Sequence, residues 1–138
     1  MNMEIRTFEL GDEDAVTSLW REVFAYEAPR NEPGFVIRSK LQTQPELFFV
    51  AIDGGAVVGT VMAGYDGHRG WIYSLAVGPS HRGRGIGTAL VRHVEAALRQ
   101  LGCPKINLQV LSSNAEVVEF YRKLGFAVEE RISMGKVI

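Results

Sequence analysis

The residues best suited to binding a ligand stand in one turn near the middle of the chain. The turn at residues 78–85 reads GPSHRGRG and leads into a helical pattern of apolar residues over 86–101. Glycine lets the backbone approach a ligand closely, and the first N–H groups of a helix have no intrahelical partner. The helix dipole adds positive potential there, and Arg82 and Arg84 add donors for an anion. The pattern therefore predicts a phosphate-binding turn.

Three kinds of phosphate ligand can be compared with this turn. A dinucleotide fingerprint requires G-x-G-x-x-G, but Thr88 stands where the third glycine belongs. A nucleotide P-loop requires G-x-x-x-x-G-K-[ST], but Arg84 and Gly85 replace its lysine and hydroxyl residue. The run RGRGIG at 82–87 instead matches R-x-x-G-x-G, which resembles the pyrophosphate loop of acyl-CoA acetyltransferases.

The elements that position this turn follow from the periodicity of the apolar residues. Strands are predicted over 4–8, 47–52, 56–65, 71–77, 105–111 and 126–136, and helices over 13–25, 35–44, 86–101 and 115–124. A loop with two prolines is predicted over 26–34, and Asp53-Gly54-Gly55 predicts the hairpin of an antiparallel meander. Residues 71–111 form a crossover unit, which places the turn at the carboxyl ends of two parallel strands.

Length and composition restrict the class of protein. A chain of 138 residues is expected to form one domain, 1–138. The formal net charge of −1 lacks the basic field of a nucleic-acid-binding protein. The single cysteine excludes an internal disulfide, the first residues do not resemble a signal peptide, and no apolar run reaches the length of a membrane helix. We therefore expect a cytoplasmic α/β protein that binds neither nucleic acid nor membrane.

Two motifs together resemble the GNAT superfamily of acetyl-CoA-dependent N-acetyltransferases. The first runs from LAV at 75–77 through Pro79 to RGRGIG, and the second comprises Asn114 and FYRKLGF at 120–126. The order of the predicted elements is also similar to that of the family. The resemblance implies an α/β (α+β) fold with a mixed, mostly antiparallel sheet of about six to seven strands and about four helices. It also implies a V-shaped splay between strands four and five.

The resemblance implies a role for several residues toward acetyl-CoA. The N–H groups of Gly83, Arg84, Gly85, Ile86, Gly87 and Thr88 would cradle the pyrophosphate, with Arg82 beside them. Leu75, Ala76 and Val77 would bind the pantetheine arm as an added strand, and the N–H of Leu75 would polarise the thioester carbonyl. Asn114 would contact the same arm. Tyr121 would protonate or stabilise the departing thiolate of CoA, because a phenol is a weak acid.

The residue that removes a proton from the amine is not evident in the sequence. The family often has a glutamate on the fourth strand two or four residues before the leucine, and here these positions hold Tyr73 and Trp71. Several residues remain candidates for the general base: Glu27, Glu32, Asp66, His68, and Tyr73 acting through water. No metal site is expected.

The acceptor is not defined by the sequence beyond a primary amine of a small molecule or of a protein N-terminus or lysine. The early helix–loop–helix corresponds to the acceptor-recognition region of the family, so Trp20, Phe24 and Tyr26 are expected to divide between the core and an acceptor pocket. Transfer would occur by direct attack in a ternary complex, in a monomer or homodimer. The alternative is a non-catalytic acyl-CoA sensor on the same fold, since the carboxylate of strand four is missing.

Overall fold

A computed structural model describes residues 3–25 and 28–138 of the chain. The chain divides into two compact units, Met1–Leu108 and Gln109–Ile138. The first unit contains the sheet and helices α1 (Glu13–Val23), α2 (Pro33–Leu41) and α3 (Ile86–Gln100). The second unit contains α4 (Ala115–Lys123) and the C-terminal segment.

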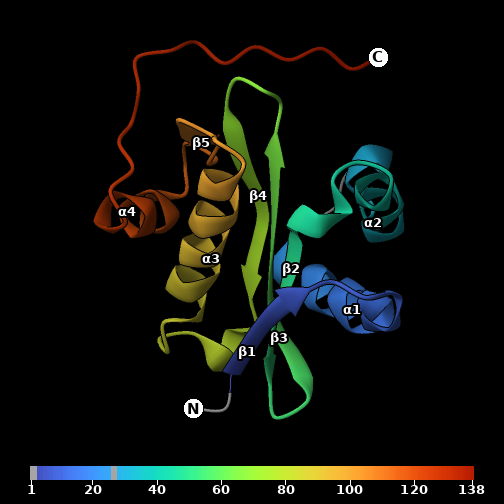
Figure 1. Cartoon of the computed structure of the whole chain (residues 1–138). Helices are drawn as coiled ribbons and strands as arrows, with labels where there is room; N and C mark the ends of the chain where they lie inside the picture. Colours follow the sequence, from blue (N-terminus) through green and yellow to red (C-terminus); the bar gives the residue numbers. More distant parts are fainter. Residues whose placement is uncertain (1–2, 26–27) are drawn as a thin grey trace. The chain divides into compact units, whose positions relative to one another are not determined.

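The sheet of the first unit is mixed, with neighbours in chain order. It comprises β1 (Met3–Thr7), β2 (Phe48–Asp53), β3 (Ala56–Tyr65), β4 (Gly70–Val77) and β5 (Ile106–Leu108). The pairs from β1 to β4 are antiparallel, whereas β4 and β5 are parallel. Helix α3 covers one face of this sheet, and α1 and α2 lie on the other (Figure 1). The predicted meander, crossover and mixed fold class are confirmed.

Several predicted boundaries differ from the observed ones. Helix α1 ends at Val23 rather than at residue 25, because Phe24 is extended. Helix α2 begins at Pro33, two residues before the predicted start, since proline suits the first position of a helix. It ends at Leu41, and Gln44 adopts a left-handed backbone with φ of 53°.

The predicted number of strands, six to seven, is too high. Strand β5 covers Ile106–Leu108 rather than 105–111, and the described sheet has five strands. No strand forms over 126–136, because the described part of the second unit contains no other strand to pair with it. Alternating side chains permit a strand, but paired backbone groups are needed to form one.

The core under α1 and α2 is built around stacked aromatic rings. The ring of Phe48 lies 4.4 Å from that of Phe8 and 5.9 Å from that of Trp20, centroid to centroid. Val16 and Ile37 bring α1 and α2 onto the same cluster, and both are fully buried. Burial of such side chains contributes about 1.5–3 kcal/mol each, so this cluster fixes both helices against the sheet.

A β-bulge interrupts β4 at Ser74 and Leu75. Tyr73 pairs with Met62 and Ala76 pairs with Thr60, so two residues of β4 stand opposite one residue of β3. Ser74 has a φ of 54°, a left-handed conformation that costs a residue with a Cβ about 1–2 kcal/mol. Bulges redirect side chains and end regular pairing, so the bulge changes the course of β4 just before Leu75.

A chain of buried hydrogen bonds connects this bulge to α1. The indole Nε1 of Trp20 donates to Oγ1 of Thr60 at 2.8 Å, and the Thr60 hydroxyl donates to the carbonyl oxygen of Ser74 at 2.9 Å. Thr60 is completely buried, so neither bond can be replaced by one to water. The hydroxyl therefore satisfies a donor on the helix and an acceptor on the bulge together.

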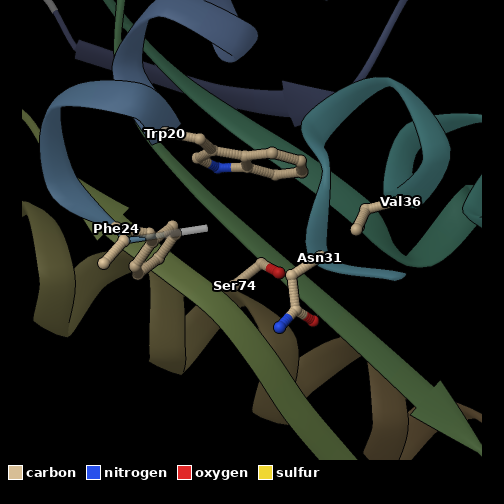
Figure 2. A pocket seen from close by; sticks show the side chains of 6 residues that line it. Trp20, Phe24, Asn31, Val36 and Ser74 are labelled. Carbon is tan, nitrogen blue, oxygen red and sulfur yellow. The ribbon is translucent and has the colours of Figure 1, made fainter. Parts of the chain in front are cut away.

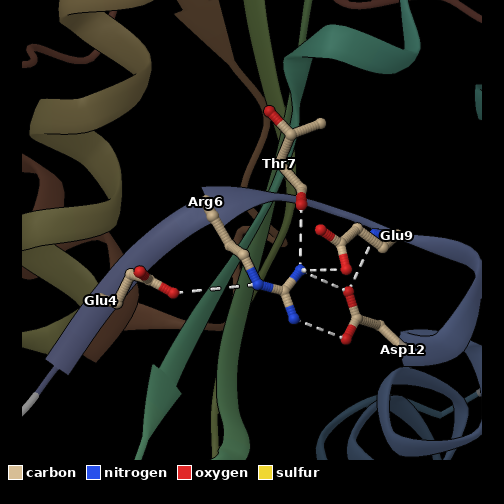
Figure 3. Close-up of polar contacts among 5 residues, drawn as sticks. All are labelled: Glu4, Arg6, Thr7, Glu9 and Asp12. Carbon is tan, nitrogen blue, oxygen red and sulfur yellow. Dashed lines mark hydrogen bonds and ion pairs between the residues drawn. The ribbon is translucent and has the colours of Figure 1, made fainter.

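An ion pair fixes the start of α1 against β1 (Figure 3). Arg6 donates through two guanidinium nitrogens to the carboxylate of Asp12, at 2.7 and 2.9 Å. Asp12 also accepts from the backbone N–H of Glu9 at 2.8 Å. The hydrogen bond from Arg6 holds the pKa of Asp12 below its usual value, and the backbone bond acts in the same direction. The ion pair thereby joins the strand to the start of the helix.

We predict that Thr60→Val destabilises the fold by about 3 kcal/mol, because it leaves a buried indole N–H and the partly buried carbonyl of Ser74 without this partner. Urea unfolding followed by tryptophan fluorescence measures this loss. Thr7→Val is the matched control, since Thr7 lies exposed on β1 and the change removes no buried bond. A loss below about 0.5 kcal/mol for Thr60→Val would show that the bulge is held by other contacts.

Candidate active site

The predicted phosphate loop has the backbone of an anion-binding turn. Gly83 and Gly85 have φ values of 78° and 80°, which glycine adopts without strain. Gly85 is the N-cap of α3, and the helical hydrogen bonds begin with the Ala89 N–H donating to Gly85 at 3.0 Å. The N–H groups of residues 86–88 therefore have no partner in the helix.

The space beside the loop is open. A Cβ atom built on Gly83 or Gly85 meets nothing within 4 Å, and both glycines are exposed. A positive helix end, unpartnered N–H groups and open space together fit the pyrophosphate of a CoA molecule. The residues present therefore suit the group that the sequence predicts.

The two arginines of the loop have different partners. Arg82 donates from Nε to the carbonyl oxygen of Val77 at 3.3 Å, which brings its guanidinium to the end of β4. Nη1 of Arg84 lies 3.5 Å from Oδ2 of Asp53, the last residue of β2. Both arginines are exposed, so each contact is weak and can exchange for a phosphate.

Strand β4 has a free edge next to this loop. Only Gly70–Ile72 of β4 pairs with β5, whose partners are Ile106–Leu108. From Tyr73 to Val77, β4 pairs with β3 on one side and with no described strand on the other. This end of pairing is the predicted splay between strands four and five. It leaves Leu75, Ala76 and Val77 at an edge that can accept an extended, peptide-like ligand.

A pocket opens beside the bulge, on the face of the sheet that α1 and α2 cover (Figure 2). Its volume is about 240 Å³, and its lining comes from α1, the following loop, α2 and β4: Trp20, Phe24, Ala25, Asn31, Val36 and Ser74. Trp20 belongs to both the core and the pocket, and Phe24 lines the pocket, as the sequence predicts. Tyr26 lies outside the described residues.

Asn114 and Tyr121 belong to the second unit. Asn114 is the N-cap of α4, and its Oδ1 accepts from the N–H of Val117 at 3.3 Å, which leaves its amide N–H₂ for other contacts. Tyr121 is 7% exposed and its ring meets Phe126 edge to face at 5.5 Å. Burial raises the pKa of Tyr121 to about 12, so its hydroxyl keeps its proton at neutral pH.

The carboxylate and histidine candidates for the general base are engaged elsewhere or exposed. Glu32 forms an ion pair with Arg21 at 2.8 Å. Asp66 accepts from the backbone N–H groups of His68 and Arg69 in an exposed turn, and these bonds lower its pKa and weaken it as a base. His68 is exposed in the same turn. Glu27 lies outside the described residues.

Tyr73 has a partner that sequence reasoning missed. Nζ of Lys40 donates to the phenol oxygen of Tyr73 at 3.2 Å and to the carbonyl oxygen of Ala63 at 2.5 Å. Lys40 is 5% exposed, and desolvation lowers its pKa to about 8. Lys40 stands three residues after Ile37, and the i, i+3 positions of a helix share a face, so the sequence could have predicted that Lys40 lies on the buried face of α2. A lysine on the apolar face of α2 was the available signal.

None of the helices in residues 3–25 and 28–138 combines the length and the apolar content needed to cross a membrane.

Comparisons with known proteins agree with this geometry. Residues 13–126 match the model of the acetyltransferase (GNAT) family. An acetyltransferase of Yersinia enterocolitica is 45% identical over 97% of this chain and 94% of its own length. An acetyltransferase of Pectobacterium atrosepticum is 46% identical over 97% of this chain and 94% of its own length.

Solved structures show the same fold. Ard1 from Thermoplasma volcanium is 25% identical, with a TM-score of 0.83 over 94% of this chain and 85% of its own. The PaiA N-acetyltransferase of Thermoplasma acidophilum, in complex with coenzyme A, is 20% identical, with a TM-score of 0.85 over 96% of this chain and 94% of its own. From the family match and the relatives we conclude that the chain belongs to the acetyltransferase (GNAT) family and is an acyltransferase that depends on acetyl-CoA.

Proposed function

We propose that this protein transfers an acetyl group from acetyl-CoA to a primary amine, by direct attack within a ternary complex. One observation carries the proposal: the free edge of β4, Leu75–Val77, leads along the backbone into the glycine loop, residues 82–88. The turn follows Val77 directly, and the side chain of Arg82, five residues further on, returns to the Val77 carbonyl. A phosphate group and a peptide-like arm can thus be bound by one stretch of backbone.

The cofactor-binding roles then follow from the local geometry. The N–H groups of residues 83–88 and the guanidinium of Arg82 would bind the pyrophosphate, with Arg84 exchanging Asp53 for a phosphate. Leu75, Ala76 and Val77 would bind the pantetheine arm, and the N–H of Leu75 would stabilise the oxyanion because the bulge redirects it. The amide of Asn114 would contact the same arm. Acetyl-CoA supplies the acetyl group as a thioester that a neutral amine can attack.

Tyr121 is proposed to act as a hydrogen-bond donor to the leaving sulfur. Its raised pKa of about 12 compares with about 8.5 for a thiol. Complete transfer of the phenol proton to a thiolate would cost about 5 kcal/mol at this difference. The hydroxyl therefore stabilises the thiolate through a charge-assisted hydrogen bond, and water provides the final proton.

The acceptor is proposed to enter through the pocket beside Ser74. The pocket meets the bulge at the residue directly before Leu75, so a group bound there lies next to the proposed oxyanion site. A volume of about 240 Å³ suits a small amine or the first side chain of a peptide. The second candidate, a non-catalytic acyl-CoA sensor, is favoured by one observation: β4 carries no carboxylate from Gly70 to Val77.

An acetylation assay on a panel of amines separates these two functions. We predict that at least one polyamine, amino acid or peptide gains an acetyl group, detected by mass spectrometry, with CoA released in equal amount. Acetyl-CoA at 100 times its Kd should also stabilise the protein by about 2.7 kcal/mol. Stabilisation without transfer to any amine would favour the sensor, and absence of both effects would reject the cofactor itself.

A glycine pair tests the phosphate loop. We predict that Gly85→Ala raises the Kd for acetyl-CoA about tenfold or more, because a Cβ at a φ of 80° distorts the cradle and loses a charge-assisted bond. Gly102→Ala is the matched control: Gly102 has a φ of 82°, lies beyond the other end of α3 and also has nothing near its Cβ. Calorimetric titration measures both. Equal loss of affinity in the two variants would count against the loop as the site.

Removal of one hydroxyl tests Tyr121. We predict that Tyr121→Phe lowers kcat about tenfold or more and changes the Kd for acetyl-CoA by less than about threefold, because the lost bond acts on the leaving sulfur. The ring contacts with Phe120 and Phe126 remain in this variant. Stopped-flow detection of thiol release measures kcat. If affinity and kcat fell equally, Tyr121 would be a packing residue.

A further inference from the structure

Lys40 is an unusual residue for the interior of this protein. Its side chain is on α2 and only 5% exposed, and its Nζ donates to the carbonyl of Ala63 on β3. No carboxylate in the described part of the chain forms an ion pair with it. Glu46, in the short 3₁₀ turn Pro45–Leu47, is the charged group that faces it and raises its pKa, and desolvation outweighs this effect. A positive charge on a buried lysine that has no paired carboxylate destabilises the folded protein, so the neutral form of the amine is favoured.

The other titratable group that faces Lys40 is the phenol of Tyr73. The phenol oxygen lies 3.2 Å from Nζ, and Nζ lies 5.5 Å from the ring centroid. The hydroxyl rests over Gly64 on β3, where a Cβ would approach it to 3.0 Å. The absence of a side chain at Gly64 therefore leaves room for the phenol. Partial burial of the side chain raises the pKa of Tyr73, so the phenol keeps its own proton at neutral pH.

The position of Tyr73 brings this pair near the proposed chemistry. Tyr73 stands two residues before Leu75 and directly before Ser74, which lines the pocket. Two residues span at most about 7 Å even when the backbone is fully extended. Tyr73 is 42% exposed whereas Lys40 is buried, so an acceptor can contact the side chain of Tyr73 but not the amine of Lys40. Lys40 can act on an acceptor only through Tyr73.

We propose that Tyr73 and Lys40 form a proton relay that deprotonates the acceptor amine, an inference that rests on the proposed function. An N–H bond of the acceptor ammonium breaks and its proton goes to the phenol oxygen of Tyr73. The O–H proton of Tyr73 moves at the same time to Nζ of neutral Lys40. The acceptor becomes a neutral amine and Lys40 becomes an ammonium. The extra proton later returns from Lys40 through the phenol of Tyr73 to water.

The relay explains how this chain works without a carboxylate on β4. A phenol alone cannot accept a proton at neutral pH, because its own proton must first have a destination. A neutral amine hydrogen-bonded to the phenol provides that destination. Desolvation brings Lys40 to a pKa of about 8, where about a tenth of the molecules are neutral at pH 7. Lys40 is thus a positioning residue that also accepts the phenol's proton, and Tyr73 is the catalytic residue.

The pH profile of kcat/KM for the acceptor tests the relay. In the wild type we expect the rate to rise with pH and to level near pH 8, where Lys40 loses its proton. In Lys40→Gln the rate at pH 7 should fall about 100-fold, and the rise should continue toward the pKa of the free amine, about 10. Tyr73→Phe should behave in the same way. The double variant should be no slower than either single variant, since the two residues act as one unit.

Matched variants and a direct titration separate this role from a structural one. In Lys40→Gln the side-chain amide can still donate to the carbonyl of Ala63. Two control variants, Lys136→Gln and Tyr65→Phe, change a lysine and a tyrosine outside the pair. Calorimetric Kd values for acetyl-CoA should remain unchanged in all variants. Side-chain NMR, with the Lys40 signal assigned by its loss in Lys40→Gln, should show a lysine that titrates near pH 8 in the wild type.

The outcomes distinguish the relay from the proposed function. Activity in the wild type with an unchanged pH profile in Lys40→Gln and Tyr73→Phe would overturn the relay and leave the transferase function intact. An ordinary pKa for Lys40 in the NMR titration would also overturn it, even if the variants failed to fold. A wild type that binds acetyl-CoA but acetylates no amine would reject the proposed function, and with it the relay.

Discussion

The structure depends on one buried hydroxyl, that of Thr60. This group accepts from Trp20 on α1 and donates to Ser74 at the bulge of β4, so it connects the aromatic core to the place where β4 changes direction. Ser74 is held in a left-handed conformation that a serine does not prefer. The hydrogen bonds and the packing of Trp20 offset that strain, of about 1–2 kcal/mol. Without the bulge, β4 would present a regular strand, with neither a redirected Leu75 nor Ser74 at the pocket.

Five consecutive residues of β4 consequently have roles in the proposed reaction. Tyr73 lies next to Lys40, Ser74 lines the pocket, and Leu75 to Val77 form the edge that no described strand covers. Successive residues of a regular strand face opposite sides of the sheet, and the bulge alters that alternation at the middle of the series. Binding of acyl donor and acceptor near one short stretch is what direct transfer requires, because it places the reacting groups together without a covalent enzyme intermediate.

Local patterns in the sequence predicted most of the fold and the turn that precedes α3, whose role in phosphate binding stays a prediction. The Gly/Arg turn before α3, the Gly54-Gly55 hairpin and the apolar periodicity each depend on nearby residues. Features that depend on distant partners were missed. The spacing from Ile37 places Lys40 on the apolar face of α2, but no local pattern indicates its hydrogen bonds to β3 and β4. The bulge at Ser74 has no signature of its own. The strand expected over 126–136 failed for the same reason, since alternation in sequence does not supply a paired neighbour. Asn114 is the N-cap of α4, and its role toward the cofactor stays a prediction.

The central claim is that the glycine loop and the free edge of β4 together bind acetyl-CoA. Backbone amide NMR during titration with CoA tests it most directly, because each N–H group reports its own change. The account predicts the largest chemical-shift changes at residues 75–77 and 83–88, with small changes on β1 and β2. Saturable changes concentrated elsewhere, with residues 83–88 unaffected, would contradict it.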